Sequence, residues 1–377
     1  MKLSNYTRLL KDISITRLNR FSGNPSKLKM LYYAITWRCN SNCIFCDVKK
    51  LNRKDLKELT SKNIGKIFED KYLKRLEYLK ITGGEPTVKE DLIDIITEIY
   101  NKSKPSYIGI TTNGLNTDII KDLVGKITNF DVSLSLRISV DGINENYNKI
   151  RNCGGNAFEK VTKTLETLKQ FQNKKNLTIG INQTVSEETL NNIDDVKKLS
   201  ENLGYEYYLF FALPTRNLWK PDTKTILSND IKDYLPVEKF SNDQIEKIFK
   251  NNINQSTLSL LTHKNSENLL SLKYYQDGFY NRIKLNKKKP NSPCLALFNR
   301  CILDPYGNIL TCNYITNPVG NASEDGFSKV WNSESSKTNR KLVKNCDKCW
   351  LGCEVIPNAI YSGEIIKWIL SQLLSGK

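Results

Sequence analysis

The sequence predicts an α/β fold: a parallel sheet curled into part of a barrel, followed by a smaller cysteine-rich module. Six apolar runs of strand length alternate with amphipathic helical stretches from residue 31 to about residue 212. This alternation is typical of a parallel sheet covered by helices. Cysteines return near the end of the chain and mark the second module. The 377 residues suffice for both, since such a barrel takes roughly 200 to 250 residues.

Each predicted strand is followed by a predicted helix. The six strands are expected at residues 31–36, 78–82, 107–112, 133–140, 177–185 and 205–211. The helices between them are expected at residues 54–73, 90–102, 118–127, 158–171 and 188–203. In barrels of this kind the reacting groups lie in loops after the carboxyl ends of the strands. We therefore look for functional residues in those loops.

Changes in composition divide the chain into five expected segments. They are a helical lead-in (1–30), the barrel (31–213), a Lys/Asn-rich helical linker or insertion (214–290), the cysteine-rich module (291–355) and an amphipathic helix (356–377). The last helix places an apolar stripe at helical spacing, with Trp368 at its edge. The stripe consists of Ile365, Ile366, Ile369, Leu370, Leu373 and Leu374. Such a helix docks on the barrel or lies on a membrane, and docking is the commoner outcome.

The chain is strongly basic, with 57 Lys and Arg against 40 Asp and Glu, a net charge of +17. This charge favours anionic partners, or reflects a composition rich in Lys and Asn, because no single block concentrates it. The one histidine, His263, argues against histidine acid–base catalysis. No apolar stretch has signal-peptide or membrane-spanning length, so we expect a cytoplasmic protein. In that compartment the ten cysteines are expected to be thiol ligands rather than disulfides.

Three cysteines follow the first predicted strand. Cys39, Cys43 and Cys46 have the spacing Cys-x3-Cys-x2-Cys, which can hold three irons of a four-iron cluster and leave the fourth iron bare. Clusters that only carry electrons normally use four cysteines. An open iron can bind a substrate or cofactor, so the spacing indicates chemistry. The alternatives are a zinc knuckle or a chance grouping.

Small and polar residues follow the next three predicted strands. The paired glycines Gly83 and Gly84 permit a close approach of the backbone to a ligand, or form a tight turn. Asn113 follows the third strand. Ser139 and Asp141 alternate at the end of the fourth strand and share one face, where a hydroxyl and a carboxylate suit a ribose. The order of these motifs, one at each strand end after the cysteine loop, favours a binding site.

With these motifs the chain resembles the radical S-adenosylmethionine (radical SAM) superfamily. The matching segments are the three cysteines, Gly-Gly-Glu-Pro at 83–86, Thr-Asn-Gly at 112–114 and Ser-x-Asp-Gly at 139–142, within residues 31 to about 212. The resemblance implies a partial (β/α)6 barrel, a [4Fe–4S] cluster, S-adenosylmethionine (SAM), and a reductant such as flavodoxin or ferredoxin. It also implies reductive cleavage of SAM to a 5′-deoxyadenosyl radical that abstracts hydrogen from a substrate C–H.

The resemblance implies roles for single residues as well. Cys39, Cys43 and Cys46 would ligate the cluster. The residues expected to bind SAM are Phe45 and Val185 at the adenine, Gly83, Gly84 and Glu85 at the methionyl amino group, Ser139 and Asp141 at the ribose, and Arg151 at the methionyl carboxylate. Asn113 is expected to bind the cofactor as well. Arg151 is equally consistent with a solvated cation beside a helix. Cys153 is either a hydrogen-atom donor to a substrate radical or a plain loop cysteine.

Six cysteines follow residue 290. Residues 302–311 predict a β-hairpin that brings Cys294 or Cys301 close to Cys312. A later Cys-x2-Cys pair could close a four-thiolate site for iron–sulfur or for zinc. The pattern resembles the auxiliary-cluster extension called SPASM, or its shorter form, twitch. By this resemblance one further [4Fe–4S] cluster has the ligands Cys294, Cys312, Cys346 and Cys349, with Cys301 and Cys353 as substitutes.

The sequence therefore predicts a radical SAM oxidoreductase or maturase that modifies an unactivated C–H position. Maturation of a ribosomally made peptide is favoured, although no peptide-recognition domain is evident before residue 31. The alternatives are modification of a lipid, a glycan or another small molecule, with peripheral contact to a membrane. A non-catalytic iron–sulfur or zinc protein that binds nucleic acid is the alternative from another class. It is disfavoured, because such a protein has no use for an open cluster beside a ribose site.

Overall fold

The computed structural model describes residues 3–212, 240–253, 257–261, 266–346 and 349–375. Contacts within the chain divide it into two compact units. The sheet unit comprises residues 27–226 and 299–336, and the helical unit comprises residues 1–26, 227–298 and 337–377. Each unit is described separately below. His263 and residues 214–239 of the predicted linker lie outside the described residues.

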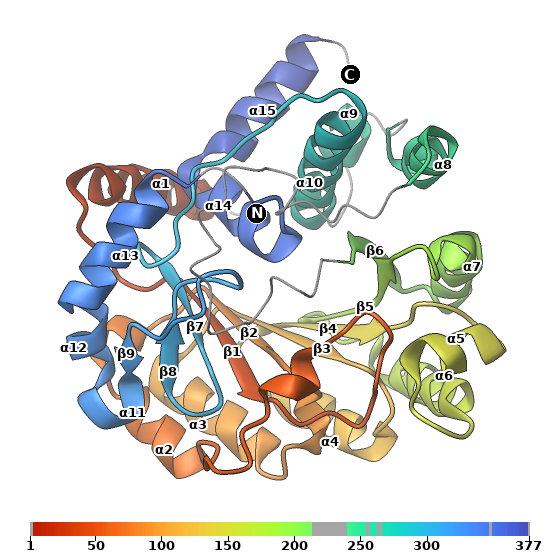
Figure 1. Cartoon of the computed structure of the whole chain (residues 1–377), viewed down its shortest axis with the longest axis horizontal. Coiled ribbons are helices and arrows are strands. Elements are labelled where there is room, and N and C mark those ends of the chain that lie inside the picture. Colours follow the sequence, from red (N-terminus) through yellow and green to blue (C-terminus); the bar gives the residue numbers. More distant parts are fainter. Residues whose placement is uncertain (1–2, 213–239, 254–256, 262–265, 347–348, 376–377) are drawn as a thin grey trace. The chain divides into compact units, whose positions relative to one another are not determined.

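The sheet unit is built on one open sheet of nine strands, with the order β6-β5-β4-β3-β2-β1-β7-β8-β9 (Figure 1). The strands are β1 (Met30–Thr36), β2 (Tyr78–Gly83), β3 (Tyr107–Thr112), β4 (Ser133–Ser139), β5 (Leu177–Val185), β6 (Glu206–Phe211), β7 (Arg300–Leu303), β8 (Asn308–Leu310) and β9 (Gly320–Asn321). Strands β1 to β6 pair in parallel. Strand β7 adds to β1 in parallel, and β8 and β9 continue as antiparallel neighbours. The predicted partial barrel is confirmed.

Helices cover one face of this sheet. The α-helices of the unit are α2 (Ser61–Ile67), α3 (Leu92–Ser103), α4 (Thr117–Ile127), α5 (Asn144–Arg151), α6 (Ala157–Leu168), α7 (Ile193–Leu203), α11 (Ala322–Asp325) and α12 (Phe327–Trp331). Figure 1 shows α2, α3, α4 and α6 along one side of the strands. Alternate strand positions carry buried Leu and Ile, for example Ile81, Ile110 and Leu136, each fully buried. The core of the unit therefore lies between these side chains and the crossover helices.

The predicted strands match the observed ones to within one residue at each end, because continuous apolar runs bounded by polar turns leave little choice of register. The predicted helix at 54–73 is wrong. The helix begins only after Thr60, whose side chain and Asn63 form a capping box. Leu59 just before it donates its N–H to the carbonyl of Pro305 at 2.7 Å. That contact holds the preceding segment in a non-helical course.

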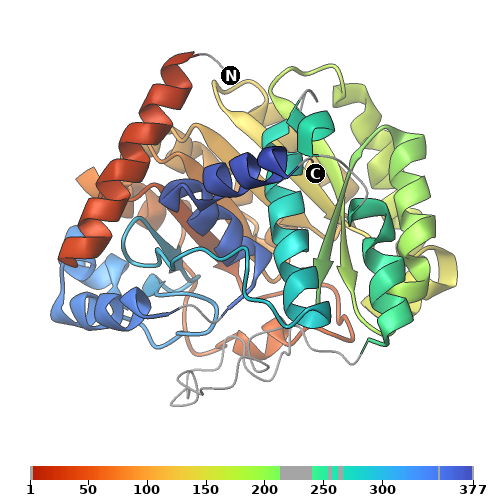
Figure 2. The ribbon, with the colours of Figure 1, turned by 90° about the horizontal axis from the view of Figure 1, so that it is seen from above.

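The helical unit contains α1 (Leu3–Ser22), α8 (Asn242–Ile253), α9 (Thr257–Leu261), α10 (Ser266–Lys284), most of α13 (Glu334–Lys344), α14 (Gly352–Ser362) and α15 (Glu364–Leu374). Figure 2 shows α1 as a long straight helix and α10 as the other long one. Helix α15 begins after Gly363, which has a φ of +76°. Among the described residues, no helix combines the length and the apolar content needed to cross a membrane.

The predicted apolar stripe of the last helix needs a correction. Trp368, expected at the edge of the stripe, is buried and meets the Tyr274 ring edge-on at 5.5 Å. Leu370 and Leu374, expected within the stripe, are exposed. The break at Gly363 sets the rotation of α15, so the buried face centres on Ile365 and Trp368. Hydrophobic spacing alone did not fix which side of the helix packs.

Candidate active site

The cysteine loop follows β1 and is clamped against the end of α5. Asn42 donates its N–H to the Arg151 carbonyl and Ile44 donates to the Ile150 carbonyl, both at 3.1 Å. Within the loop the Cys46 N–H binds the Cys43 carbonyl at 3.1 Å. These backbone bonds fix the course of the loop at the carboxyl end of the parallel sheet. The sequence predicted this position for the cysteine loop.

Gly83 and Gly84 lie against the backbone of the segment that leads into this loop, where only glycine fits. A Cβ atom on Gly83 would lie 2.3 Å from the Thr36 carbonyl oxygen, and one on Gly84 would lie 2.1 Å from the Arg38 carbonyl oxygen. The N–H groups of Gly84 and Glu85 donate to these same two oxygens at 2.7 and 2.8 Å. The glycines therefore allow β2 and the cysteine loop to approach each other closely. The N–H groups of Gly84 and Glu85 are therefore bound within the chain.

Glu85 ties the end of β2 to the end of β3. Its Oε1 accepts bonds from the Thr112 hydroxyl at 2.6 Å and from the Thr87 hydroxyl at 2.7 Å. Its Oε2 accepts the Asn113 N–H at 2.7 Å. Burial raises the pKa of Glu85, and these hydrogen bonds oppose the rise. The carboxylate thus holds neighbouring strand ends in place, and its predicted contact with the methionyl amino group stays a prediction.

Asn113 and Cys153 both reach the cysteine loop. The Asn113 amide donates to the Asn40 side-chain oxygen at 2.7 Å and to the Ser41 hydroxyl at 2.8 Å. The Cys153 thiol lies 3.3 Å from the same Ser41 hydroxyl. The loops after β1 and β3 and the segment after α5 therefore meet at Ser41, which the sequence reasoning missed. The polar residues between Cys39 and Cys43 were the only signal for it.

Two residues predicted to bind SAM are paired with each other. The Arg151 guanidinium forms an ion pair with Asp141, with 2.5 Å between Nη2 and Oδ2. Asp141 also accepts the Thr184 N–H at 2.7 Å. Arg151 Nη1 lies 3.5 Å from Cys43 Sγ, and the guanidinium lies 5.9 Å from the centre of the Phe45 ring. Burial raises the pKa of Asp141, and the Arg151 charge opposes the rise.

The buried polar groups fit a ligand that carries a carboxylate. Arg151 is 8% exposed, and its Nε–H has no hydrogen-bond acceptor among the residues that the structure describes. An unfulfilled buried donor costs free energy that a bound carboxylate would recover. Ser139, which is buried, and Val185, 1% exposed, stand at the ends of β4 and β5. The positions expected to hold SAM thus gather at one edge of the sheet, although their individual roles stay predictions.

The three thiols of the loop differ in exposure. Cys39 and Cys43 are half-buried, and Cys46 is exposed. Burial raises the pKa of the Cys39 thiol to about 11. Within the described ranges, no three His, Cys, Asp or Glu side chains stand close enough together to hold a single metal ion. A four-iron cluster is much larger than one ion, so its ligands stand further apart.

The second set of cysteines is divided between the two units. Cys301 and Cys312 belong to the sheet unit, and Cys294, Cys346, Cys349 and Cys353 belong to the helical unit. The predicted hairpin is present as β7 and β8. Cys301 lies inside β7, fully buried, and burial raises the pKa of its thiol. Cys312 follows β8, is only partly buried, and accepts the Ile315 N–H at 3.3 Å on its Sγ. Of these two cysteines, Cys312 is better placed to ligate a cluster, because its thiol is less deeply buried.

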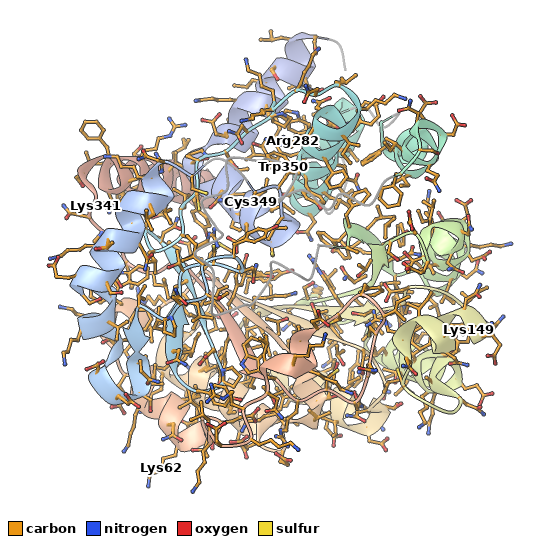
Figure 3. The ribbon with its side chains drawn as sticks, viewed as in Figure 1. Lys62, Lys149, Arg282, Lys341, Cys349 and Trp350 are labelled. Carbon is orange, nitrogen blue, oxygen red and sulfur yellow. The ribbon has the colours of Figure 1, made fainter. Side chains whose placement is uncertain are left out.

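Trp350 anchors the Cys-x2-Cys pair within the helical unit. It follows Cys349, is fully buried, and donates its indole N–H to the Tyr275 carbonyl at 2.8 Å. The Arg282 guanidinium lies 3.5 Å from its ring centre (Figure 3). A Cβ atom on Gly278 would lie 1.9 Å from the same ring. Sequence reasoning missed this anchor, because Gly278 and Arg282 lie in a helix about 70 residues earlier in the chain.

Comparison with known protein families gives two matches. The radical SAM superfamily matches residues 33–196, and an iron–sulfur cluster-binding domain, SPASM, matches residues 294–351. Among curated proteins, a probable GTP 3′,8-cyclase of Methanococcus aeolicus is 29% identical over half of this chain and 60% of its own length. The mycofactocin maturase MftC of Mycolicibacterium smegmatis is 25% identical over 46% of this chain and 42% of its own length. The chain spans about half the length of the curated relatives it matches.

Solved structures share the fold. SuiB of Streptococcus suis superposes with a TM-score of 0.56 at 13% identity, over 93% of this chain and 79% of that chain. The enzyme anSMEcpe with bound AdoMet gives a TM-score of 0.55 at 16% identity, over 92% of this chain and 98% of that chain. A radical SAM domain implies a [4Fe–4S] cluster and SAM as cofactors, and a SPASM domain implies further iron–sulfur chemistry. The chain thus belongs to the radical SAM superfamily and carries a SPASM iron–sulfur domain behind its radical SAM domain.

Proposed function

We propose that this protein uses a [4Fe–4S] cluster and SAM to modify an unactivated C–H position of a peptide substrate. The observation that carries the proposal is the cysteine loop, which backbone bonds to α5 and the Asn113 amide fix at the carboxyl end of the sheet. When bound, the cluster and SAM supply a one-electron cleavage that yields a radical able to remove a hydrogen atom from the substrate. The chain holds the thiols, orients the cofactor and excludes water.

Each of these tasks has a residue that fits it. Cys39, Cys43 and Cys46 would hold the cluster, since three thiolates leave one iron open. Arg151 would present its unfulfilled Nε–H to the methionyl carboxylate, held in orientation by Asp141. The apolar groups buried behind the strand ends keep water from a reactive radical.

The second cysteine set is proposed to hold an auxiliary cluster. Cys294, Cys312, Cys346 and Cys349 would be its ligands, with Cys353 as a substitute. Such a cluster can take an electron from a substrate radical or anchor the substrate. Metal analysis of anaerobically reconstituted protein tests this: about eight irons per chain support two clusters. About four irons with bound zinc would make the second site structural.

The choice of a peptide substrate rests on two likenesses. One relative is named a mycofactocin maturase. SuiB, solved with the precursor peptide SuiA, shares the fold with a TM-score of 0.55 at 15% identity. A small-molecule substrate is the second candidate, because several relatives are named probable GTP 3′,8-cyclases. Incubation of the reduced enzyme with GTP and SAM separates the two: consumption of GTP would favour the second.

The proposed reaction type is tested by anaerobic reconstitution, reduction with dithionite and addition of SAM. We expect 5′-deoxyadenosine and methionine from the wild-type chain and none from Cys43→Ala. Cys301→Val is the matched control, since it removes a thiol from a strand interior outside the loop. The proposal fails if the wild-type chain makes no 5′-deoxyadenosine, or if Cys43→Ala makes as much as wild type.

A further inference from the structure

The face of the sheet opposite the crossover helices carries the cations Lys80 on β2 and Arg137 on β4. Lys80 on β2 donates to the Thr111 hydroxyl on β3 at 2.5 Å. Thr111 is the register partner of Arg137 on β4, so Thr111 and Arg137 point to the same face. Two positive charges therefore flank one hydroxyl across three neighbouring strands. The sequence reasoning did not single out either cation.

An aromatic wall supports Arg137. Its guanidinium lies 4.0 Å from the centre of the Tyr208 ring and 6.0 Å from that of Phe210, both on β6. The register partner of Arg137 on β5 is Gly180. A Cβ atom on Gly180 would lie 2.5 Å from the Tyr208 ring, so only glycine leaves room for that ring. The flat guanidinium is thus held against a flat ring, a favourable cation–π arrangement.

The hydrogen-bonding capacity of Arg137 is unused. Throughout the ranges that the structure describes, no atom accepts a hydrogen bond from its guanidinium and no carboxylate forms an ion pair with it. By contrast, Arg282 donates to the carbonyls of Gly278 and Pro290. The Glu206 carboxylate on the same face accepts the Tyr208 hydroxyl. The charge of the Glu206 carboxylate acts on Arg137 through space without a direct ion pair. A guanidinium has five N–H donors and is always charged, so these donors are open to the oxygens of a further anion.

The position of Arg137 relates it to the proposed reaction site. Arg137 precedes Ser139 by two residues on β4, so both side chains stand on one face, one pleat repeat apart. Ser139 is the residue expected to contact the ribose of SAM. A group bound at Arg137 would therefore lie next to the cofactor, deeper along the strand.

We propose that Arg137, with the charge of Lys80 and the Tyr208 wall, binds a carboxylate of the substrate, such as an acidic side chain or the C-terminus of a peptide. The inference rests on the proposed function, because it names a feature of the substrate for that site. A planar guanidinium backed by a ring presents paired N–H groups in one plane. That geometry matches the two oxygens of a carboxylate.

The test is equilibrium dialysis of radiolabelled glutarate against the reconstituted protein saturated with SAM, so that the carboxylate site for SAM is filled. We expect saturable binding near one glutarate per chain, with no competition from the neutral isostere glutaramide. Arg137→Gln is expected to weaken binding at least tenfold, since it removes a charge-assisted bidentate pair. Arg137→Lys keeps the positive charge but loses the paired N–H groups of the guanidinium, so it should weaken glutarate binding by less than Arg137→Gln does.

Lys104→Gln is the matched control for net charge. Lys104 is also a cation over a tyrosine, 4.3 Å from the Tyr100 ring centre, but it is exposed. The Lys104→Gln variant should bind glutarate with the same affinity as the wild-type protein. Equal binding by wild type and Arg137→Gln, or no saturable binding, overturns the inference. Tighter binding of inorganic phosphate than of glutarate overturns the assignment to a carboxylate. If Arg137→Gln does not fold, a wild-type affinity in Arg137→Lys serves as the overturning result.

The outcome is separable from that of the proposed function. Formation of 5′-deoxyadenosine by the wild-type chain under dithionite needs no substrate, so it tests the cofactor chemistry alone. Glutarate binding without SAM cleavage would keep the anion site and refute the reaction. SAM cleavage without glutarate binding would support the proposed reaction and refute the anion site at Arg137.

Discussion

The Arg151 guanidinium lies 2.5 Å from the Asp141 carboxylate, and neither side chain is exposed by more than a tenth. The pair joins the end of β4 to the end of α5. Arg151 also reaches Cys43 of the cysteine loop, and its backbone carbonyl holds Asn42. A cofactor carboxylate that binds Arg151 would share it with Asp141. The pair is thus the link between the strand end and the loop that carries the thiols.

Removal of Asp141 is expected to destabilise the fold strongly. Asp141→Ala leaves the Arg151 charge buried without its partner, which typically costs about 3–5 kcal/mol. Urea denaturation measures the loss. The control is Asp55→Ala, which breaks an exposed, solvent-screened pair with Arg53 and should lower the stability far less. Equal losses in the two variants would contradict the role given to the buried pair.

Gly84→Ala should damage the cysteine loop. The added methyl group would lie 2.1 Å from the Arg38 carbonyl oxygen, so the backbone must shift. We expect a loss of about 1–3 kcal/mol or more and lower iron content after reconstitution. Gly125→Ala is the matched control, because nothing lies within 4 Å of its added atom. A helix-interior alanine should stabilise by about 0.5–1 kcal/mol. Full iron content in Gly84→Ala would refute the close approach.

Asn113 is predicted to position the loop rather than only to touch SAM. Asn113→Ala removes the bonds to Asn40 and Ser41, so the loop gains freedom and iron binding should weaken even without SAM. Iron retention during chelator challenge measures this. Asn156→Ala, which removes an exposed amide bond to Glu159, should behave as wild type. If Asn113→Ala retains iron normally but loses affinity for SAM, the role is direct cofactor contact instead.

Gly278→Ala should affect the auxiliary cluster selectively. The added atom would overlap the Trp350 ring, so Trp350 and the adjacent Cys349 must move. We expect iron per chain to fall by up to about four, while 5′-deoxyadenosine formation persists. Iron analysis and the SAM cleavage assay together check this. A loss of SAM cleavage with the auxiliary iron retained would show that Trp350 does not anchor the Cys-x2-Cys pair.

Residues whose role is local were predictable from the sequence. The strands followed from continuous apolar runs, and the place of Cys39, Cys43 and Cys46 followed from the strand before them. Partners far apart in sequence were not predictable. The bond from Asn113 to Ser41 spans 72 residues, and the closeness of Trp350 to Gly278 depends on the packing of two helical segments. Arg137 went unnoticed because one cation in a strand gives no periodic signal.

The pairing of β7 with β1 has a consequence for how the protein is made. Strand β1 emerges early in synthesis, but its partner on one side, Arg300–Leu303, emerges some 270 residues later. Until then β1 presents an open edge to other chains, and such edges promote aggregation. A truncated chain ending before β7 would keep that edge for good. The radical SAM segment alone is therefore expected to be a poor unit for expression, although it contains all three thiols of the cysteine loop.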